Sequence, residues 1–552
     1  MKTIIIGGVA GGASAAARLR RLDEEAEIIL LERGKYISYA NCGLPYFIGG
    51  EITDKKALTL QTPQSFNARF AVDVRIENEA VLIDAEKQVV TIHNLMDDTI
   101  YTESYDNLIL SPGAEPVYPA FAKIEDDRIF TLRTIPDTFR IHDYIEAHSP
   151  KTAVIIGGGF IGLEMAENLT KAGLSVSLVE ASDHILAPLD YDMAAHVHHY
   201  LREKGLSLYL KQSVKSLSSH LGNLTVHLSN DREIKTDLVL LAIGVRPDTQ
   251  LAKTASLAMN ERGAILVDEF MQTSSPHIYA VGDAVEVRNF VTQLPSYVPL
   301  AGPANKQGRI AADHIAGLTS KYSGTQGSSV LKLFDLTIAT TGLNEKQAAE
   351  SNLAFDKVCL YPFSHATYYP GASSLTMKVV FEKETGRILG AQTLGFEGAE
   401  KRIDVLATAI RAGMTAFDLT ELELCYAPPF SSAKDPVNMA GFMIENILKG
   451  KVEQFHWNDA DSVVHDENAL LLDVRTEEEY QMGHIEGSLH IPLHLLRNRI
   501  EELDSSKTIY VHCQSGLRSY VACRILSQKG FRCFNLAGGY SFYDTVTSDL
   551  QY

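Results

Sequence analysis

The stretch TAVIIGGGFIGLEMAENL, residues 152–169, decides the fold predicted for this chain. It reads as a short buried strand, a glycine-rich turn and the start of a helix. Gly157, Gly159 and Gly162 match G-x-G-x-x-G, whose glycines permit a tight turn, the approach of a pyrophosphate and close helix packing. Glu180 ends the next apolar run, where a carboxylate accepts from a ribose hydroxyl and repels a 2′-phosphate. We therefore expect a dinucleotide site that favours NADH over NADPH.

The chain opens with a related loop, GGVAGG, in which Gly7 and Gly12 match the pattern and Val9 replaces its second glycine. Glu32 ends the following apolar run, as Glu180 does after the other loop. Two dinucleotide sites on one chain predict a flavin that is reduced by a nicotinamide. The motif VGDA supports FAD, because Asp283 follows a strand and a glycine and is placed to bind a ribityl or phosphate-linked hydroxyl. An Asp in such a turn is equally often a plain helix cap.

Length, net charge and cysteine count limit the number of domains, the kinds of partner and the compartment that we expect for this protein. The chain has 552 residues, enough for about four domains. A net charge of −19 argues against binding to nucleic acid or to an anionic membrane surface. Six cysteines do not form a disulfide framework in a chain of this length, and we expect a cytoplasmic protein. There is no signal-peptide pattern, and no apolar run approaches the roughly 18 residues of a membrane helix.

The pattern changes along the chain. Apolar strands alternate with helical segments over the first two-thirds, which predicts the α/β class with parallel sheets covered by helices. Residues 325–445 mix strands and amphipathic helices as an α+β domain does. Residues 446–458 are polar and read as a linker, and residues 459–552 form a compact α/β pattern.

Cys42 lies in ISYANCGLPYFIGG without a second cysteine nearby. Two-thiol reductases store electrons in a C-x-x-x-x-C disulfide, but here the partner position is Phe47. Cys42 could instead be a core thiol, although core cysteines usually lie in periodic apolar segments. The flanking Asn41 and Gly43 belong to a non-periodic turn, so we expect a reactive thiol that pairs with a partner able to leave.

A second sulfur site is predicted at CQSGLR, from Cys513 to Arg518, between a strand and a helix. Backbone N–H groups at a helix N-terminus lower a thiol pKa and stabilise a persulfide anion. The loop is one residue shorter than phosphatase loops, which suits sulfur transfer better than phosphate binding. The alternative is a plain strand–helix turn.

The first helix offers a basic face. Ser14, Arg18 and Arg21 are spaced so that they share one side of it. Two guanidinium groups there can clamp phosphates. The alternative, a solvated basic face, suits Arg20 better than it suits Arg18 and Arg21.

Several motifs together resemble one family. GGVAGG, SYANCGLPY, LSPGA, GGGFIG, VGDA, HATYYPGA and YAPPFSSAKDPVN, over residues 1–445, resemble the single-cysteine branch of the pyridine nucleotide–disulfide oxidoreductases. LLLDVRTEEEY, GHIEGSLHIPL and VHCQSGLRSYVACRIL, over about 455–552, resemble a rhodanese domain. The fusion resembles the coenzyme A disulfide/persulfide reductases that carry a rhodanese module.

The resemblance implies a domain plan. It places a split FAD-binding domain at 1–118 and 247–324 around an NAD-binding domain at 119–246. A dimerisation domain follows at 325–445, and after the linker a rhodanese domain at 459–552. It also implies a homodimer whose active sites borrow residues from the partner subunit.

The resemblance also assigns residues to sites. Residues assigned to FAD are Gly7, Gly8, Ala10, Gly11, Gly12, Glu32, Arg33, Asn41, Cys42, Ser111, Pro112, Gly113, Arg133, Asp283, Pro299, Leu300, Ala301 and Asn305. Those assigned to NAD are Gly157, Gly159, Phe160, Ile161, Gly162, Glu164, Glu180 and Gly244. Those assigned to coenzyme A are Ser14, Arg18, Arg21, Ser38, Asn41, Arg69 and Lys434. Catalytic roles fall to Cys42, Cys513, Arg518, Tyr426 and Tyr368, with Tyr369 as the alternative to Tyr368. No metal site is predicted.

The implied activity is an FAD-dependent NAD(P)H:coenzyme A persulfide or disulfide reductase. Cys42 would form a mixed disulfide with coenzyme A, and Cys513 would handle sulfane sulfur. One alternative is an NADH oxidase or peroxidase with a Cys42 sulfenate. Such enzymes carry a His in the first glycine loop, where this chain has Val9 and Ala10. A sulfur carrier with a regulatory flavin half is the weakest alternative.

Overall fold

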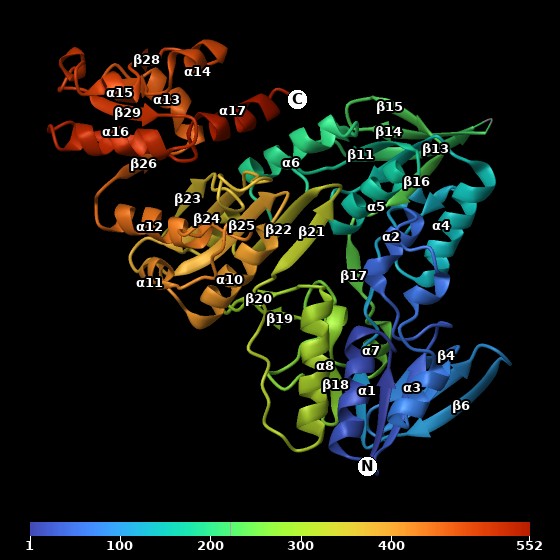
Figure 1. The fold of residues 1–552 in the computed structure, drawn as a ribbon. Coiled ribbons are helices and arrows are strands. Elements are labelled where there is room, and N and C mark those ends of the chain that lie inside the picture. Colours follow the sequence, from blue (N-terminus) through green and yellow to red (C-terminus); the bar gives the residue numbers. More distant parts are fainter. Residues whose placement is uncertain (221) are drawn as a thin grey trace. The chain divides into compact units, whose positions relative to one another are not determined.

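The computed structural model describes every residue except 221, and the chain divides into two compact units. The dinucleotide unit comprises Met1–Asp183 and Gly205–Gly327. The C-terminal unit comprises His184–Lys204 and Ser328–Tyr552. Figure 1 shows the fold, with many of the helices and strands labelled.

A five-stranded parallel sheet begins the dinucleotide unit. Its strand order is β18 (Ile278–Ala280), β7 (Asn107–Leu110), β1 (Lys2–Ile6), β2 (Glu27–Glu32) and β3 (Asp73–Ile76). The inner strands β7, β1 and β2 are mostly apolar because both faces of the sheet are covered there, whereas the edge strand β3 is partly exposed. The parallel sheet that was expected from the alternating pattern is thus confirmed.

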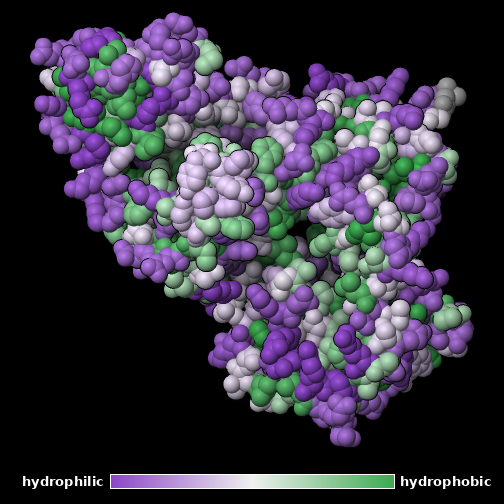
Figure 2. Space-filling view, in the orientation of Figure 1, coloured by the Kyte–Doolittle hydropathy of each residue, from purple (hydrophilic) through white to green (hydrophobic). Residues whose placement is uncertain are grey.

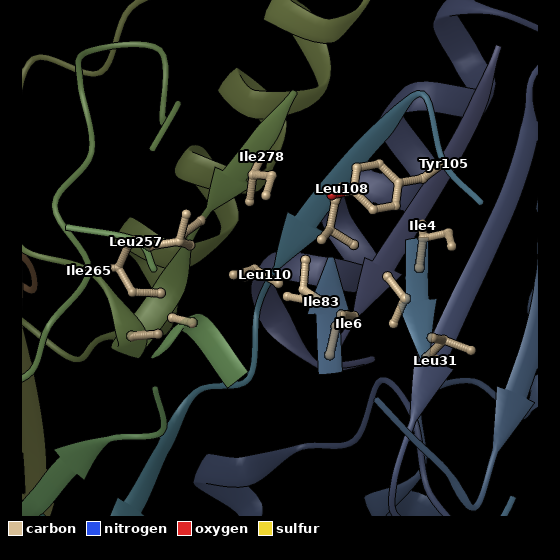
Figure 3. Close-up of a cluster of buried hydrophobic side chains, with 14 of the residues drawn as sticks. Ile4, Ile6, Leu31, Ile83, Tyr105, Leu108, Leu110, Leu257, Ile265 and Ile278 are labelled. Carbon is tan, nitrogen blue, oxygen red and sulfur yellow. The ribbon is translucent and has the colours of Figure 1, made fainter. Parts of the chain in front are cut away.

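The two faces of this sheet have separate cores. Ile5 points to the face covered by α1 (Ala10–Leu22) and α8 (Ala301–Ile315), whose alanines pack closely on it. Ile4 and Ile6 point to the other face, where they meet Ile83 and its neighbours (Figure 3). Ile83 belongs to an antiparallel sheet made of β4 (Asn78–Asp84), β5 (Val89–Asn94) and β6 (Thr99–Ser104). Successive side chains of a strand alternate between faces, which gives one strand two cores.

A second parallel sheet repeats the plan. Its order is β12 (Ser207–Tyr209), β11 (Ser175–Val179), β10 (Thr152–Ile156), β16 (Leu238–Leu241) and β9 (Ile129–Phe130). The elements that accompany it are α4 (Ile135–His148), α5 (Phe160–Lys171), β13 (Val214–His220), β14 (Asn223–Leu228) and β15 (Glu233–Thr236). β13, β14 and β15 form a three-stranded antiparallel sheet. This repeat agrees with two dinucleotide-binding domains on one chain.

The chain passes between the two domains through a pair of short strands. β8 (Ala114–Pro116) and β17 (Val245–Pro247) pair in antiparallel fashion. They lie at the residues where the expected FAD and NAD segments meet, near 118 and 247. The pair of strands therefore brings together the two chain segments at which the boundaries of the inserted segment are predicted.

The C-terminal unit contains the expected α+β domain. Its antiparallel sheet has the order β21 (Ser329–Leu333), β22 (Leu336–Gly342), β25 (Ile388–Gly395), β24 (Thr376–Glu382) and β23 (Phe355–Leu360). The helices α10 (Ala399–Ala412) and α12 (Pro436–Leu448) follow it in the chain.

A third parallel sheet lies in the last part of the chain, from residue 453 onward. Its order is β26 (Glu453–Phe455), β30 (Cys533–Leu536), β29 (Thr508–His512), β27 (Ala469–Asp473) and β28 (Leu489–His490). The prediction of a linker at 446–458 was wrong in two respects, since α12 continues to Leu448 and residues 453–455 pair with β30. Polar composition hid this edge strand, in which only Phe455 is buried.

One helix departs from the expected domain plan. α6 (Tyr191–Glu203) falls within the segment 119–246, yet it belongs to the C-terminal unit. There it packs against α17 (Gly539–Asp549), and the buried Asp549 accepts hydrogen bonds from His198 Nδ1 at 2.8 Å and from Tyr191 Oη at 2.9 Å. Arg202 Nη1 lies 2.5 Å from the same carboxylate. These side-chain partners explain why α6 belongs to the C-terminal unit. They lie far from α6 in the sequence, so a local sequence pattern does not predict them.

A buried lysine, Lys378, binds the N-terminal end of α6. Lys378 Nζ lies 2.9 Å from Asp190 and 2.7 Å from Asp192, and it also contacts Glu345. The three carboxylates raise the pKa of Lys378 well above its ordinary value, against the opposing effect of burial. They are therefore an ion-pair cluster around a cation of the chain itself.

The face drawn in Figure 2 is largely hydrophilic, with apolar residues in scattered groups. Among the described residues, none of the helices has the length and apolar composition required to span a bilayer.

Candidate active sites

The first glycine loop has the geometry of a phosphate cradle. Gly7 has φ 98°, and a Cβ at Gly12 would lie 1.9 Å from the carbonyl oxygen of Gly7. Larger residues are thus excluded where α1 meets β1. The Glu32 carboxylate accepts hydrogen bonds from the backbone N–H groups of Gly8 at 3.0 Å and Gly34 at 2.8 Å. The acid therefore sits at the base of the loop, beside the helix N-terminus.

The second glycine loop repeats this construction. A Cβ at Gly162 would lie 2.0 Å from the carbonyl oxygen of Gly157. Glu180 accepts from the backbone N–H groups of Gly158 and Ser182, both at 2.7 Å. Phe160 and Ile161 begin α5, as expected for a loop that opens a helix. Both loops thus fit a dinucleotide, and each carboxylate lies where a ribose would be held.

A cavity of about 530 Å³ opens at the first loop. The FAD-assigned residues that line it are Gly7, Ala10, Gly11, Glu32, Arg33, Asn41, Ser111, Pro112, Gly113, Arg133 and Asp283. Arg133 Nη2 lies 3.8 Å from Asp283, so a cation and an acid face the same space. Burial raises the pKa of Asp283, and Arg133 partly opposes that shift. The charge pattern suits a ligand with both phosphates and hydroxyls.

Sequence reasoning missed part of this lining. The residues that line the cavity but were not assigned include Val9, Tyr39, Tyr118, Thr131, Thr134, Asp137, Arg246 and Ala304. Conversely, the assigned residues Gly8, Gly12, Cys42, Pro299, Leu300, Ala301 and Asn305 do not line it. Asn305 accepts from the Ser14 hydroxyl at 2.7 Å and lines a different cavity. Tyr39 was detectable as the aromatic before Cys42 in SYANC.

Cys42 lies in a 3-10 turn, Asn41–Gly43, immediately before α2 (Leu44–Ile48). Its side chain is exposed, whereas Phe47 is buried against Phe139. The interpretation of a reactive rather than a core thiol is consistent with this exposure. Loss of water around the sulfur raises the pKa of the Cys42 thiol, and the carboxylates of Glu164 and Asp283 raise it further.

Glu164 brings the second glycine loop close to this thiol. It lies in α5, on which α2 packs. Burial, with a smaller contribution from Glu167, raises the pKa of Glu164 to about 7. Its charge therefore changes near neutral pH, beside the sulfur of Cys42. This residue was assigned to NAD, and its electrostatic effect on the thiol is an additional property.

A second cavity, of about 450 Å³, carries a set of cations. The residues assigned to coenzyme A that line it are Ser14, Arg18, Arg21, Ser38 and Arg69. Arg309, Phe66 and Phe70 also line it and were not predicted. Arg18 is not free to point outward as expected, because its Nε donates to Asp313 at 2.6 Å. Asn41 lies in the first cavity instead.

Two predicted tyrosines meet in the C-terminal unit. The hydroxyls of Tyr368 and Tyr426 lie 2.7 Å apart, and both side chains are exposed. Tyr369 packs its ring against His365 instead. Lys434, which was assigned to coenzyme A, is exposed.

The Cys513 loop connects β29 to α16 (Leu517–Ser527). Cys513 is buried, and its Sγ accepts from the backbone N–H of Gly516 at 3.2 Å and from the Ser519 hydroxyl at 3.3 Å. The expected cradle at a helix N-terminus is therefore present, and Ser519 is a donor that was not predicted.

The arginine of this loop has an acidic partner. Arg518 donates from both Nη atoms to the two carboxylate oxygens of Glu479, each at 2.7 Å. This hydrogen-bonded pairing lowers the pKa of Glu479 to about 2. Glu479 lies in α14 (Glu477–Met482), far from the loop in sequence, and local motifs gave no sign of it.

Two dinucleotide loops, an exposed thiol at Cys42 with no second cysteine nearby in the sequence, and a separate thiol cradle at Cys513 indicate a class of proteins that use a flavin and a nicotinamide. The chain belongs to the pyridine nucleotide-disulphide oxidoreductases, whose family model matches residues 1–316. The dimerisation domain of that family matches residues 328–436, and a rhodanese-like domain matches residues 457–544. The chain is therefore a flavin-dependent oxidoreductase that uses a pyridine nucleotide, and the expected family and fold are confirmed.

Three similar proteins are named more specifically than the family. A coenzyme A disulfide reductase of Staphylococcus epidermidis is 36% identical over 442 residues, covering 80% of this chain and 99% of that protein. The structure of reduced Bacillus anthracis CoADR-RHD matches with a TM-score of 0.97 at 50% identity, covering 99% of this chain and 98% of that one. An NAD-dependent persulfide reductase from A. fulgidus matches with a TM-score of 0.92 at 37% identity, covering 98% and 100%.

Proposed function

We propose that this protein is an FAD-dependent NADH:coenzyme A persulfide and disulfide reductase that works through a Cys42–S–S–coenzyme A mixed disulfide. The exposed single thiol at Cys42 carries the proposal, because Phe47 replaces the second thiol of a two-cysteine reductase. A thiol without an internal partner needs a partner that arrives with the substrate. The relatives named for coenzyme A disulfide and persulfide reduction support this choice of substrate.

The basic cavity supports coenzyme A as the carrier. Arg18, Arg21, Arg69 and Arg309 line one space, and guanidinium groups bind phosphates in a bidentate manner. Coenzyme A has a diphosphate and a 3′-phosphate, which match several cations held together in an acidic protein. Ser38 lines the same cavity and is close in sequence to Cys42, so the pantetheine arm has a short path from the cations to the thiol.

The chemistry at Cys42 is an exchange between sulfurs. The Cys42 thiolate attacks the inner sulfur of coenzyme A persulfide, forms Cys42–S–S–coenzyme A and releases HS⁻. FAD, when bound, supplies the two electrons from NADH that return this disulfide to Cys42 thiolate and coenzyme A thiol. With coenzyme A disulfide the leaving group is a coenzyme A thiolate. The sum is one coenzyme A persulfide and one NADH converted to coenzyme A thiol, HS⁻ and NAD⁺.

The chain's own groups control the proton balance. Loss of water around the sulfur, together with the carboxylates of Glu164 and Asp283, raises the pKa of Cys42, so a smaller fraction is thiolate before substrate arrives. The hydrogen-bonded pair Tyr368 and Tyr426 offers a phenol that can protonate a leaving thiolate. We propose that these tyrosines, with Lys434, act on the partner subunit's site in a homodimer, as the dimerisation-domain match suggests.

Cys513 is the proposed site of sulfane sulfur transfer. The Gly516 N–H and the Ser519 hydroxyl both donate to its sulfur, and the same donors can hold a persulfide anion. The pantetheine arm could then carry sulfur between Cys513 and Cys42.

Steady-state NADH oxidation with coenzyme A persulfide tests the proposal. Cys42→Ser should lose at least about 100-fold in kcat, since nucleophilic attack is removed. Cys425→Ser, which changes the other exposed cysteine, should retain wild-type turnover. Undiminished turnover by Cys42→Ser would contradict the proposal, and faster turnover with oxygen or peroxide than with persulfide would favour an oxidase or peroxidase.

A further inference from the structure

We propose that Glu479 sets the donor specificity of the Cys513 site, so that it accepts thiol persulfides and rejects thiosulfate. The inference rests on the proposed sulfur-transfer function of Cys513 and assigns that site its class of substrate. It begins from the observation that Arg518, the cation that closes the loop, is already occupied.

The pairing of Arg518 with Glu479 uses both of its Nη atoms. Both Nη atoms donate to Glu479, one to each carboxylate oxygen at 2.7 Å. This is the bidentate geometry that a sulfonate or phosphate would otherwise adopt on a guanidinium. The side chains of Arg518 and Glu479 are 34% and 24% exposed, so solvent screens the pair only in part. An incoming anion must displace Glu479 or share the guanidinium with it.

The other arginine beside the loop is also neutralised. Arg475 is buried and pairs with Asp473, with Nη2 2.8 Å from Oδ2. Its Nη1 donates to Gln514 of the loop at 3.2 Å, so its position is fixed. Each of these two guanidinium groups therefore has its own carboxylate.

What remains for a substrate is the cradle at the helix N-terminus. In this cradle the Gly516 N–H and the Ser519 hydroxyl donate hydrogen bonds. Two such donors can stabilise one negatively charged sulfur. Thiosulfate is a dianion whose sulfonate end needs a free cation. A thiol persulfide such as that at the pantetheine end of coenzyme A presents its transferable sulfur next to uncharged groups. Like-charge contact with Glu479 therefore opposes thiosulfate and has little effect on a persulfide.

Both donors give the same enzyme product without net oxidation. From R–S–SH, the Cys513 thiolate takes the terminal sulfur as Cys513–S–S⁻, the old S–S bond breaks, and R–SH leaves with the proton. From thiosulfate, the Cys513 thiolate takes the outer sulfur and sulfite leaves. The two reactions differ at the leaving group, which is the part that Glu479 and Arg518 would meet.

The test compares two sulfur donors on the full chain, with cyanide as acceptor. We measure kcat/KM for thiosulfate and for glutathione persulfide and take their ratio. Glu479→Gln keeps an oxygen that accepts from Arg518 and removes the charge, and the ratio should shift about tenfold toward thiosulfate. Glu479→Asp keeps the charge and should stay near the wild-type ratio, which separates charge from local packing.

Glu478→Gln is the matched control, since Glu478 is exposed on the same helix and loses the same charge. Its ratio should equal that of the wild type. A wild-type preference for thiosulfate, or an unchanged ratio in Glu479→Gln, would overturn the assignment.

Cys513→Ser separates the proposed sulfur transfer by Cys513 from the proposed specificity role of Glu479. If it still transfers sulfur, the function of Cys513 fails; if it does not, an unchanged ratio counts against Glu479 alone.

Discussion

The hydroxyl oxygens of Tyr368 and Tyr426 lie 2.7 Å apart, although the two residues come from separate motifs. The hydrogen bond raises the pKa of Tyr368. A bonded pair of phenols acts as one proton donor, because one hydroxyl orients the other. The contact also favours Tyr368 over Tyr369 as the catalytic tyrosine, since the Tyr369 ring packs on His365.

The first prediction concerns this pair. Tyr368→Phe and Tyr426→Phe should each lower kcat for coenzyme A persulfide by about 10- to 100-fold, because protonation of the leaving thiolate is lost. The double variant should be little worse than either single one, since both act on one proton. Tyr369→Phe serves as the control and should remain close to the wild type. Additive losses would show that the two phenols act independently.

A second prediction follows from the charges around Cys42. Glu164→Gln removes a negative charge near the sulfur, and the pKa of Cys42 should fall because the thiolate is less disfavoured. Alkylation by iodoacetamide, followed across pH 6 to 9, reports the thiolate fraction. The variant should react faster than the wild type at pH 8.

The wild type has a further pH signature. Glu164 has a pKa of about 7, so it gains its charge as the pH rises through neutrality and holds back thiolate formation in that range. Its alkylation profile should therefore be broader than that of Glu164→Gln. Glu146→Gln, an exposed change on α4, should reproduce the wild-type profile. Identical profiles for all three proteins would contradict the electrostatic account.

The basic cavity gives a third prediction. Arg69→Ala and Arg309→Ala should each raise KM for coenzyme A persulfide about tenfold, because each removes a phosphate contact. Pantetheine persulfide lacks these phosphates, so its KM should not change. Arg262→Ala, an exposed arginine outside the cavity, is the control. Equal effects on both substrates would place the coenzyme A phosphates elsewhere.

A fourth prediction concerns the C-terminal helix. Asp549 is buried, and its hydrogen bonds with His198, Arg202 and Tyr191 hold its pKa well below the ordinary value despite burial. Asp549→Ala leaves these donors without their acceptor, at a cost of about 3 kcal/mol. Hydrogen exchange in residues 539–549 should accelerate by at least about tenfold. Asp544→Ala, exposed on the same helix, should leave exchange unchanged, and protection that survives Asp549→Ala would contradict the prediction.

Local patterns could predict much of the fold. The glycine loops, the acids after the next strands and the C-x-x-x-x-R loop are each encoded within a short stretch, and the structure has them as expected. The polar composition of residues 446–458 led to the wrong prediction of a linker. The edge strand there has three residues, of which one is buried, and so few residues give no recognisable apolar pattern.

Long-range side-chain pairing could not be predicted. Arg18 is held by Asp313, which lies 295 residues away in sequence, and Arg518 is held by Glu479, 39 residues away. A charge in a sequence does not reveal which opposite charge it will meet. Arg18 was therefore expected to bind a phosphate, and Arg518 was given a catalytic role without its acidic partner. The placement of α6 beside α17 depends on Asp549 in the same way.

The most direct test of the central claim is peptide mass spectrometry of the full-length protein after treatment with coenzyme A disulfide. The account predicts one coenzyme A on the peptide that contains Cys42, removed by NADH in the FAD-loaded protein, with Cys425 unmodified. An unmodified Cys42 under these conditions, or a sulfenate in place of the coenzyme A adduct, would contradict it.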